Sequence, residues 1–309
     1  MRILLTTTSF QDTPGKHHDA LKNTGLEVDT LRGPIPEKEL LPIIAKYDGV
    51  ICGDDFYTKR VLEKGKKGKL KVLSKYGIGL DKIDLTAAEE LDITVTNCRG
   101  VNHFTVAEHS FALMLAFYKN IPDQINFTRN GEWKRFTGRE IYGKKIGVAG
   151  LGRIGKEILI RAKIFGLEIF AFDQFIDEKF VEKNDVTICR TLEELVSNVD
   201  ILSLNMDSNE SNYHIINQDL LFNHVKKSLL IINTARGELV DESAIIDGIE
   251  KGIISGYVTD VLEQEPMDPI HPFRKMKNVL ISPHVGSRTF ESVERQGIMA
   301  VENLLKHFY

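Results

Sequence analysis

Cysteine is scarce in this 309-residue sequence, in which only Cys52, Cys98 and Cys189 occur. Their odd number and the absence of any C-x-x-C spacing exclude a disulfide framework and give no support to a cysteine-ligated zinc site. The sequence also lacks any apolar run near the roughly 18 residues that a transmembrane helix needs, and its N-terminus lacks the long apolar region of a signal peptide. These absences predict a soluble, cytoplasmic protein.

The chain has no block of like charge. Its 40 basic and 44 acidic side chains leave a formal net charge of −4, and the short basic stretch Lys64–Lys71 is interrupted by Gly65 and Gly68. Nucleic-acid binding depends on a concentrated basic surface, so nucleic acid is not an expected partner. We interpret the lysine stretch as a solvated turn.

Short apolar runs alternate with helix-like stretches along the whole chain. Most of these runs are continuously apolar, which is typical of strands that are covered on both faces of a parallel sheet. The sequence therefore predicts an α/β fold with parallel sheets. The predicted strands are Arg2–Thr8, Tyr47–Cys52, Lys71–Ser74, Ile93–Thr96, Lys145–Ala149, Glu168–Phe172, Ile201–Leu204, Leu229–Asn233, Tyr257–Val261 and Val279–Ser282.

The length predicts two domains, at about 150 residues each. The first series of strands gives way near Thr105 to a long helix, whose body Phe111–Phe117 is apolar around most of its circumference. Such a helix must be buried on more than one side, either as a core helix or between domains or subunits. The final predicted helix, Phe290–His307, can pack back on the N-terminal part. We therefore expect one domain from residues 1–98 and 287–309 and another from residues 99–286.

A glycine-rich turn follows the predicted strand Lys145–Ala149. It has the pattern G-x-G-x-x-G at Gly150, Gly152 and Gly155, and it opens a helix in which Ile154, Ile158, Ala162 and Phe165 recur at helical spacing. In a dinucleotide-binding turn the first glycine permits the turn, the second lets the backbone approach the pyrophosphate, and the third lets helix and strand pack closely. The position between a strand and a helix makes this a strong signal for a dinucleotide cofactor.

An acidic residue, Asp173, ends the next predicted strand, where a carboxylate can accept hydrogen bonds from the hydroxyl groups of the adenosine ribose. A 2′-phosphate at this place would meet a like charge, at a cost of up to about 4 kcal/mol for an effective dielectric of about 20. The sequence thus favours NAD over NADP.

Three further strands of the second domain end in residues that suit an oxidoreductase. Arg236 follows Leu229–Asn233, Glu265 follows the strand that contains Asp260, and His284 follows Val279–Ser282. Arginine can bind a carboxylate with two parallel hydrogen bonds. Histidine can take or give the proton that accompanies hydride transfer, and a neighbouring glutamate orients the ring and favours its protonated form.

These motifs together resemble the D-isomer-specific 2-hydroxyacid dehydrogenases. The resemblance rests on Asn233–Gly237, Asp260–Pro266 and Ser282–Gly286 together with the glycine turn, and it covers nearly the whole chain. Lys75–Asp84 resembles the substrate loop of the family, and Val106–His109 matches the start of its interdomain helix.

The resemblance implies two Rossmann-like domains: a flavodoxin-like substrate domain and an NAD-binding domain. It implies that Arg236 binds the substrate, that Glu265 is the partner of the histidine, and that His284 is the general acid and base. It further implies a homodimer built around the interdomain helix. The implied cofactor-binding residues are Gly150, Gly152, Arg153, Ile154, Gly155, Asp173, Thr234, Ala235 and Asp260; the implied substrate-binding residues are Lys75, Gly77, Ile78, Gly79 and Arg236.

Two departures from the family pattern bear on cofactor and substrate. Where most members have His-x-Pro-Leu after the third strand of the cofactor domain, this chain has Asn205–Ser208, which puts cofactor affinity on the adenine side in question. Members that act on 3-phosphoglycerate place basic residues around the phosphate. Lys75 occupies one such position, but the segment Cys52–Asp55, with Asp54 and Asp55, stands where another arginine is often found. The substrate is therefore expected to be a 2-hydroxy or 2-oxo acid, with 3-phosphoglycerate as one candidate.

Other basic residues and other functions are weaker candidates. Arg99, Arg135 and Arg139 are expected at the surface, and Cys98 has no histidine partner that would make it a nucleophile. A dinucleotide-sensing binding protein, like the corepressors that share this fold, is the alternative outside the enzymes. Phosphite dehydrogenase is an alternative within them, whereas Glu265 argues against a formate dehydrogenase, which has glutamine there.

Overall fold

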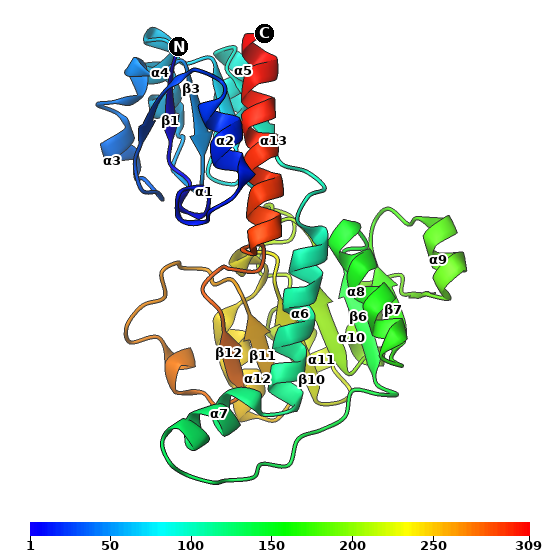
Figure 1. Cartoon of the computed structure of the whole chain (residues 1–309). Coiled ribbons are helices and arrows are strands. Elements are labelled where there is room, and N and C mark those ends of the chain that lie inside the picture. The colour runs from blue at the N-terminus through cyan, green and yellow to red at the C-terminus, as the bar shows by residue number, and fades with distance from the viewer. The chain divides into compact units, whose positions relative to one another are not determined.

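The computed structural model describes all 309 residues, which form two compact units (Figure 1). The first unit contains Met1–Asn102 and Ser287–Tyr309, and the second unit contains His103–Gly286. The first unit therefore continues four residues beyond the boundary expected at residue 98, because Arg99–Asn102 leads up to the long helix α6 instead of belonging to it. None of the helices combines the length and apolarity that are needed to cross a membrane.

The first unit is built on a five-stranded, entirely parallel sheet with the order β2-β1-β3-β4-β5. This order is that of the flavodoxin-like folds. The elements are β1 (Arg2–Leu5), α1 (Thr8–Asp12), α2 (Lys16–Lys22), β2 (Glu27–Thr30), α3 (Glu37–Leu40), the 3-10 helix η1 (Ile44–Lys46), β3 (Gly49–Cys52), α4 (Lys59–Lys67), β4 (Val72–Lys75), α5 (Leu85–Glu90), β5 (Thr94–Asn97) and α13 (Phe290–Phe308).

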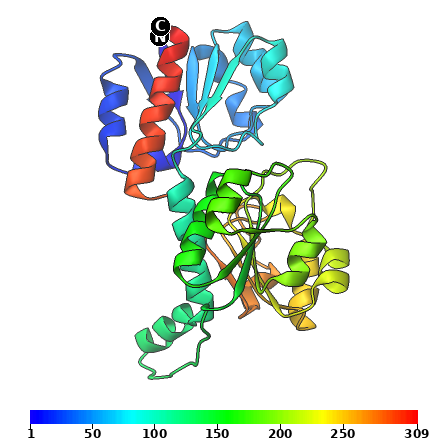
Figure 2. The same cartoon turned by 90° about the vertical axis from the view of Figure 1, so that its right-hand side faces the viewer.

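Helices cover both faces of this sheet, which explains why its central strands are apolar on both sides. Leu4 and Val50 belong to the core beneath α4 and α5, whereas their neighbours Ile3 and Ile51 belong to the core that includes α13. The C-terminal helix α13 packs against α2, β3, β4 and β5, so the two ends of the chain share one hydrophobic core (Figures 1 and 2).

The second unit is built on a seven-stranded parallel sheet with the order β12-β11-β10-β9-β6-β7-β8. Apart from the additional edge strand β12, this is the Rossmann order, in which the direction of strand addition reverses at β6. The elements are α6 (His103–Tyr118), α7 (Ile121–Arg129), β6 (Lys145–Ala149), α8 (Arg153–Ile164), β7 (Glu168–Phe172), α9 (Glu178–Asn184), β8 (Thr187–Ile188), α10 (Leu192–Asn198), β9 (Ile201–Leu204), α11 (Gln218–His224), β10 (Leu229–Asn233), η2 (Gly237–Leu239), α12 (Glu242–Glu250), β11 (Ile254–Thr259), η3 (Pro272–Lys275) and β12 (Val279–Ile281).

The same two-sided burial holds here. Along β10, Leu230 and Ile232 pack in the core that contains α6 and α8, while Leu229 and Ile231 pack in the core that contains α10, α11 and α12. Figure 2 shows α6 and α8 side by side on one face of this sheet. The prediction of an α/β fold with parallel sheets is confirmed.

Several predicted boundaries are wrong for local reasons. Thr8 does not extend β1 but begins α1, and Lys64–Lys67, interpreted as a turn, forms the last turn of α4 before Gly68 ends it. The strand expected to contain Asp260 ends at Thr259, so Asp260 lies just beyond it. Strands β2 and β8 were not predicted, because β2 is a half-polar edge strand and β8 has only two residues.

Candidate active site

The turn between β6 and α8 has the geometry that each of its glycines is expected to provide. Gly150 has a φ of +102°, and a Cβ atom there would lie 2.6 Å from the carbonyl oxygen of Asn205. A Cβ atom on Gly155 would collide with the carbonyl oxygen of Gly150, so only glycine lets the helix approach the strand. At Gly152, by contrast, a Cβ atom would meet no atom within 4 Å beyond the adjacent residues of the turn. The open side of Gly152 is where a phosphate can approach free amide groups at the start of α8, which opens with Arg153 and Ile154.

Asp173 lies directly beside this turn, one residue after β7. Its carboxylate accepts hydrogen bonds from the amide groups of Leu151, at 2.6 Å, and Phe175, at 2.8 Å. Asp173 therefore holds the glycine turn in place in addition to presenting a negative charge at the carboxyl end of β7.

Asn205, one of the departures from the family pattern, follows β9 at the point where the strand order reverses. Its amide nitrogen donates to the carbonyl oxygen of Ala149 at 2.8 Å, and its side-chain nitrogen donates to Ser203. Its buried Oδ1 atom has no partner within the protein. The glycine turn, Asp173 and this unused acceptor fit the phosphate and ribose groups of a dinucleotide.

Glu265 and His284 form a hydrogen-bonded pair in the second unit. Oε2 of Glu265 lies 2.8 Å from Nδ1 of His284, and Oε1 of Glu265 accepts from the amide of Leu262 at 2.9 Å. The side chains are 38% and 46% exposed, so a small molecule can reach the ring. A carboxylate at Nδ1 fixes the proton there and leaves Nε2 as the atom that can exchange a proton with a substrate.

The backbone of His284 is left-handed, with a φ of +53°. Its amide nitrogen donates to the carbonyl oxygens of Asp260, at 2.8 Å, and Ser282, at 3.0 Å. A non-glycine residue in this region is uncommon and persists only where its surroundings enforce it. These hydrogen bonds direct the imidazole toward Glu265.

A buried carboxylate, Asp260, holds this turn together. Asp260 is 3% exposed and accepts hydrogen bonds from Ser282 Oγ and from the amides of Val285 and Gly286, at 2.5, 2.9 and 2.6 Å. His109 of α6 lies 3.3 Å from Asp260 and 2.8 Å from Ser282 Oγ through its Nε2 atom. Burial raises the pKa of Asp260, but the hydrogen bonds from these four residues outweigh burial and lower it below the usual range. The structure thus makes Asp260 a support of the His284 turn.

Asn233, the last residue of β10, supports the turn that carries Arg236. Its side chain donates to the carbonyl oxygen of Arg236 at 2.9 Å and accepts from the amide of Ala235 at 3.0 Å. Thr234 in the same turn is bonded to Ser110 of α6 at 2.9 Å. Arg236 therefore leaves the carboxyl edge of the same sheet as the glycine turn and the histidine.

Three supporting residues, Asn233, His109 and Ser282, received no role from the sequence, although each lies inside a motif. The only signal was that they lie within the segments Asn233–Gly237, Val106–His109 and Ser282–Gly286. The residue type alone does not show that a side chain holds a turn, because this depends on its hydrogen bonds.

The predicted substrate loop lies in the first unit, after β4. Gly77 has a φ of +107°, and its carbonyl oxygen accepts from the amide of Cys98 at 2.7 Å, while Asn97 donates to the carbonyl oxygen of Ile78 at 2.7 Å. These bonds fix the loop that continues to Gly79. The thiol of Cys98 is buried, and burial raises its pKa to about 11, which keeps it protonated and unsuited to nucleophilic chemistry.

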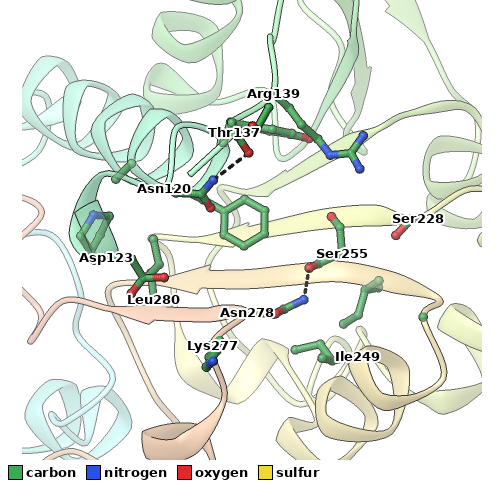
Figure 3. Close-up of a pocket in the computed structure, with 17 residues that line it drawn as sticks. Asn120, Asp123, Thr137, Arg139, Ser228, Ile249, Ser255, Lys277, Asn278 and Leu280 are labelled. Carbon is green, nitrogen blue, oxygen red and sulfur yellow. Dashed lines mark hydrogen bonds between the residues drawn. The ribbon is translucent and has the colours of Figure 1, made fainter. Parts of the chain in front are cut away.

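A separate pocket of about 490 Å³ lies at the opposite edge of the second unit's sheet (Figure 3). Its lining includes Ser228, Ile254 and Asn278, which stand at the amino ends of β10, β11 and β12, together with Arg139 and Lys277. Arg139 is thus remote from the edge that carries Arg236 and His284. Arg236 and His284 lie instead at the carboxyl edge, where open parallel sheets bind their ligands.

Comparison with known proteins agrees with this geometry. Residues 111–286 match the family described as D-isomer specific 2-hydroxyacid dehydrogenase, NAD binding domain. A D-3-phosphoglycerate dehydrogenase of Methanocaldococcus jannaschii is 36% identical over 296 residues, which cover 94% of this chain and 55% of that protein. A glyoxylate reductase of Korarchaeum cryptofilum is 35% identical over 243 residues, covering 77% of this chain and 73% of the relative.

The fold is also similar to solved structures. The TT0316 protein from Thermus thermophilus superimposes with a TM-score of 0.89 at 33% identity, covering 100% of this chain and 97% of the other. The apo-structure of D-lactate dehydrogenase from Escherichia coli gives 0.87 at 27% identity, with 99% and 96% covered. The chain spans about half the length of the phosphoglycerate dehydrogenases that it matches, at 55% and 54%.

Proposed function

Because the chain belongs to the D-isomer-specific 2-hydroxyacid dehydrogenase family, we propose that it catalyses reversible, NAD-dependent oxidation of a D-2-hydroxy acid to the 2-oxo acid. The observation that carries this proposal is the pair of Glu265 and His284 at 2.8 Å, on the same sheet edge as a turn that fits a dinucleotide.

In this reaction each residue of the site has its own role in substrate binding or proton transfer. Arg236 binds the substrate carboxylate and the oxygen at C2 with its planar guanidinium, and the loop Gly77–Gly79 provides backbone contacts to the carboxylate. In the oxidative direction His284 takes the hydroxyl proton at Nε2 while the C2–H bond breaks and its electron pair leaves as hydride. Glu265 holds the ring at Nδ1 and stabilises the charge that the ring acquires. A bound nicotinamide supplies the hydride acceptor in this direction and the donor in the other.

The experiment that tests this function follows the absorbance of NADH while a panel of 2-oxo acids is offered to the purified protein. The panel contains glyoxylate and 3-phosphohydroxypyruvate, which the names of the relatives suggest, together with hydroxypyruvate, pyruvate and branched and aromatic 2-oxo acids. Reduction of at least one of them at enzymatic rates is expected. If none is reduced, the function is wrong, and oxidation of phosphite with NAD would then be measured.

The carboxylate of Asp173 is proposed to set the preference for NAD. We expect Asp173→Asn to raise the ratio of catalytic efficiency with NADPH to that with NADH by roughly 10-fold to 100-fold, because a 2′-phosphate no longer meets a like charge at the end of β7. Asparagine keeps an oxygen that can accept from the Leu151 amide, so the glycine turn should persist.

Asp185→Asn is the matched control for this prediction. Asp185 is exposed, pairs with Lys163 on the surface, and has a φ of +56° that asparagine tolerates. An unchanged cofactor ratio in Asp173→Asn would show that cofactor choice depends on other residues.

The protein is further proposed to form a homodimer through α6, α7 and the segment that follows them. Large apolar side chains are exposed there, with Ile125 at 44% and Trp133 at 80%. Contact with a second copy would remove this surface from water. Light scattering tests this point, since a molar mass near 34.9 kDa would identify a monomer.

A further inference from the structure

The substrate loop of the first unit is flanked by an ion pair between a buried lysine and an exposed aspartate. Lys75, the last residue of β4, has a side chain that is only 6% exposed, and its Nζ atom lies 2.7 Å from Oδ1 of Asp54. A buried ammonium group requires a negative partner, and Asp54 is that partner. The positive charge expected to receive a phosphate is therefore already compensated.

The neighbouring acid, Asp55, has a different role. Asp55 is fully buried, and its carboxylate accepts hydrogen bonds from Thr6 Oγ1 and from the amide of Ile35. Burial raises the pKa of Asp55, against the opposing effect of these hydrogen bonds. Asp55 thus holds the loop after β3, whereas the carboxylate of Asp54 is 65% exposed and can face a ligand.

A second group beside the loop lacks a hydrogen-bond partner. Gln296 of α13 is 1% exposed, and its Nε2 donates to Ser292 and Ser287, while its buried Oε1 has no partner within the protein. A Cβ atom built on Gly77 would lie 4.0 Å from this Oε1 and 4.0 Å from Nζ of Lys75. Both side chains therefore border the same residue of the loop.

We propose that Asp54, Lys75 and Gln296 form a specificity subsite that selects 2-oxo acids with a short, uncharged, hydroxyl-bearing tail and rejects phosphorylated ones. This inference rests on the proposed function, in which the loop Gly77–Gly79 contacts the substrate carboxylate. The C3 substituent is two carbon–carbon bonds away from that carboxylate, so it lies beside the same side chains. The subsite offers two acceptors, Asp54 Oδ and Gln296 Oε1, and one donor, Lys75 Nζ, a set that a hydroxyl group can match and a phosphate dianion cannot.

The test measures kcat and KM for hydroxypyruvate and 3-phosphohydroxypyruvate with NADH, in the unaltered protein and in Asp54→Asn. Asparagine keeps an oxygen that can accept from Lys75 but removes the negative charge. The unaltered protein is expected to prefer hydroxypyruvate. In Asp54→Asn the ratio of kcat/KM for the phosphorylated acid to that for hydroxypyruvate should rise by roughly 10-fold to 100-fold, mainly through a lower KM for the phosphorylated acid.

Asp92→Asn is the matched control, since Asp92 is fully exposed in the same unit and its φ of +50° suits asparagine. It should leave the ratio unchanged. The inference is overturned if the unaltered protein prefers the phosphorylated acid, or if Asp54→Asn keeps the original ratio while its melting temperature is preserved. If the unaltered protein reduces no 2-oxo acid at all, the proposed function fails first, and this result is distinct from a failure of the subsite.

Gln296→Met provides an independent measurement, because it has a similar volume but no acceptor. The preference for hydroxypyruvate over pyruvate should fall several-fold in this variant, while the preference between hydroxypyruvate and its phosphorylated form changes less. An unchanged hydroxypyruvate-to-pyruvate ratio in a folded Gln296→Met protein would remove Gln296 from the subsite.

Discussion

Replacing His284 with alanine is expected to lower kcat/KM for every 2-oxo acid by about 10²-fold to 10⁴-fold, the usual contribution of a positioned general acid. The imidazole is the group that exchanges the substrate proton, and water cannot take its place with the same geometry. The affinity for NADH should be nearly unchanged, because the glycine turn and Asp173 belong to other strand ends. Steady-state kinetics and fluorescence titration of NADH measure the two quantities separately.

His307→Ala is the matched control, since His307 is an exposed residue in the last turn of α13 and takes no part in the site. It should leave kcat/KM unaltered. Retention of more than a tenth of the activity by His284→Ala would assign the acid–base role to another group. Glu265→Gln should show a smaller loss than His284→Ala, because it keeps the hydrogen bond at Nδ1 but removes the charge.

Removing the guanidinium of Arg236 is the second large effect. Arg236→Ala should lower kcat/KM by about 10²-fold to 10³-fold, because two charge-assisted hydrogen bonds to the substrate carboxylate are lost. Arg236→Lys should recover only part of this loss, since lysine carries the charge but cannot reproduce the planar pair of donors. The loss in the lysine variant should appear mainly as an increase in KM.

The control is Arg139→Lys, at the opposite edge of the same sheet, which should behave like the unaltered protein. Near-normal efficiency in Arg236→Lys would exclude Arg236 from carboxylate binding. Both Arg236 variants are expected to stay folded, because the side chain of Asn233 bonds to the backbone of Ala235 and Arg236 and is unchanged in them.

The strand that precedes Asp260 ends earlier than the sequence predicts. The sequence predicts that Asp260 lies within a strand, and the family resemblance implies that it binds the cofactor. In the structure it lies one residue after β11, and its carboxylate accepts hydrogen bonds from Ser282, Val285 and Gly286, which flank His284. A strand end is decided by which backbone groups still find partners in the neighbouring strand, and local sequence does not contain that information.

The ion pair of Lys75 and Asp54 is a second feature that the sequence does not predict. From sequence, Lys75 was one of the positive charges that a phosphate could use, and the acids at 54 and 55 were not distinguished. They differ because β3 and β4 lie side by side, so that the residues following β3 meet the end of β4. Charge compensation between residues 21 positions apart depends on strand order, and only tertiary structure sets strand order.

What the sequence determined by itself is the class of the fold and the chemistry of the carboxyl edge. Continuously apolar strands are typical of a sheet that is covered on both faces, and a glycine turn between strand and helix is typical of a ligand that approaches the backbone. Both patterns lie within short stretches of the sequence, so they can be recognised without the structure. The tertiary structure decided how the reactive side chains are supported and which charges remain available. His109, Ser282 and Asp54 act through partners that are distant in sequence, and such a hydrogen bond or ion pair depends on how the chain folds.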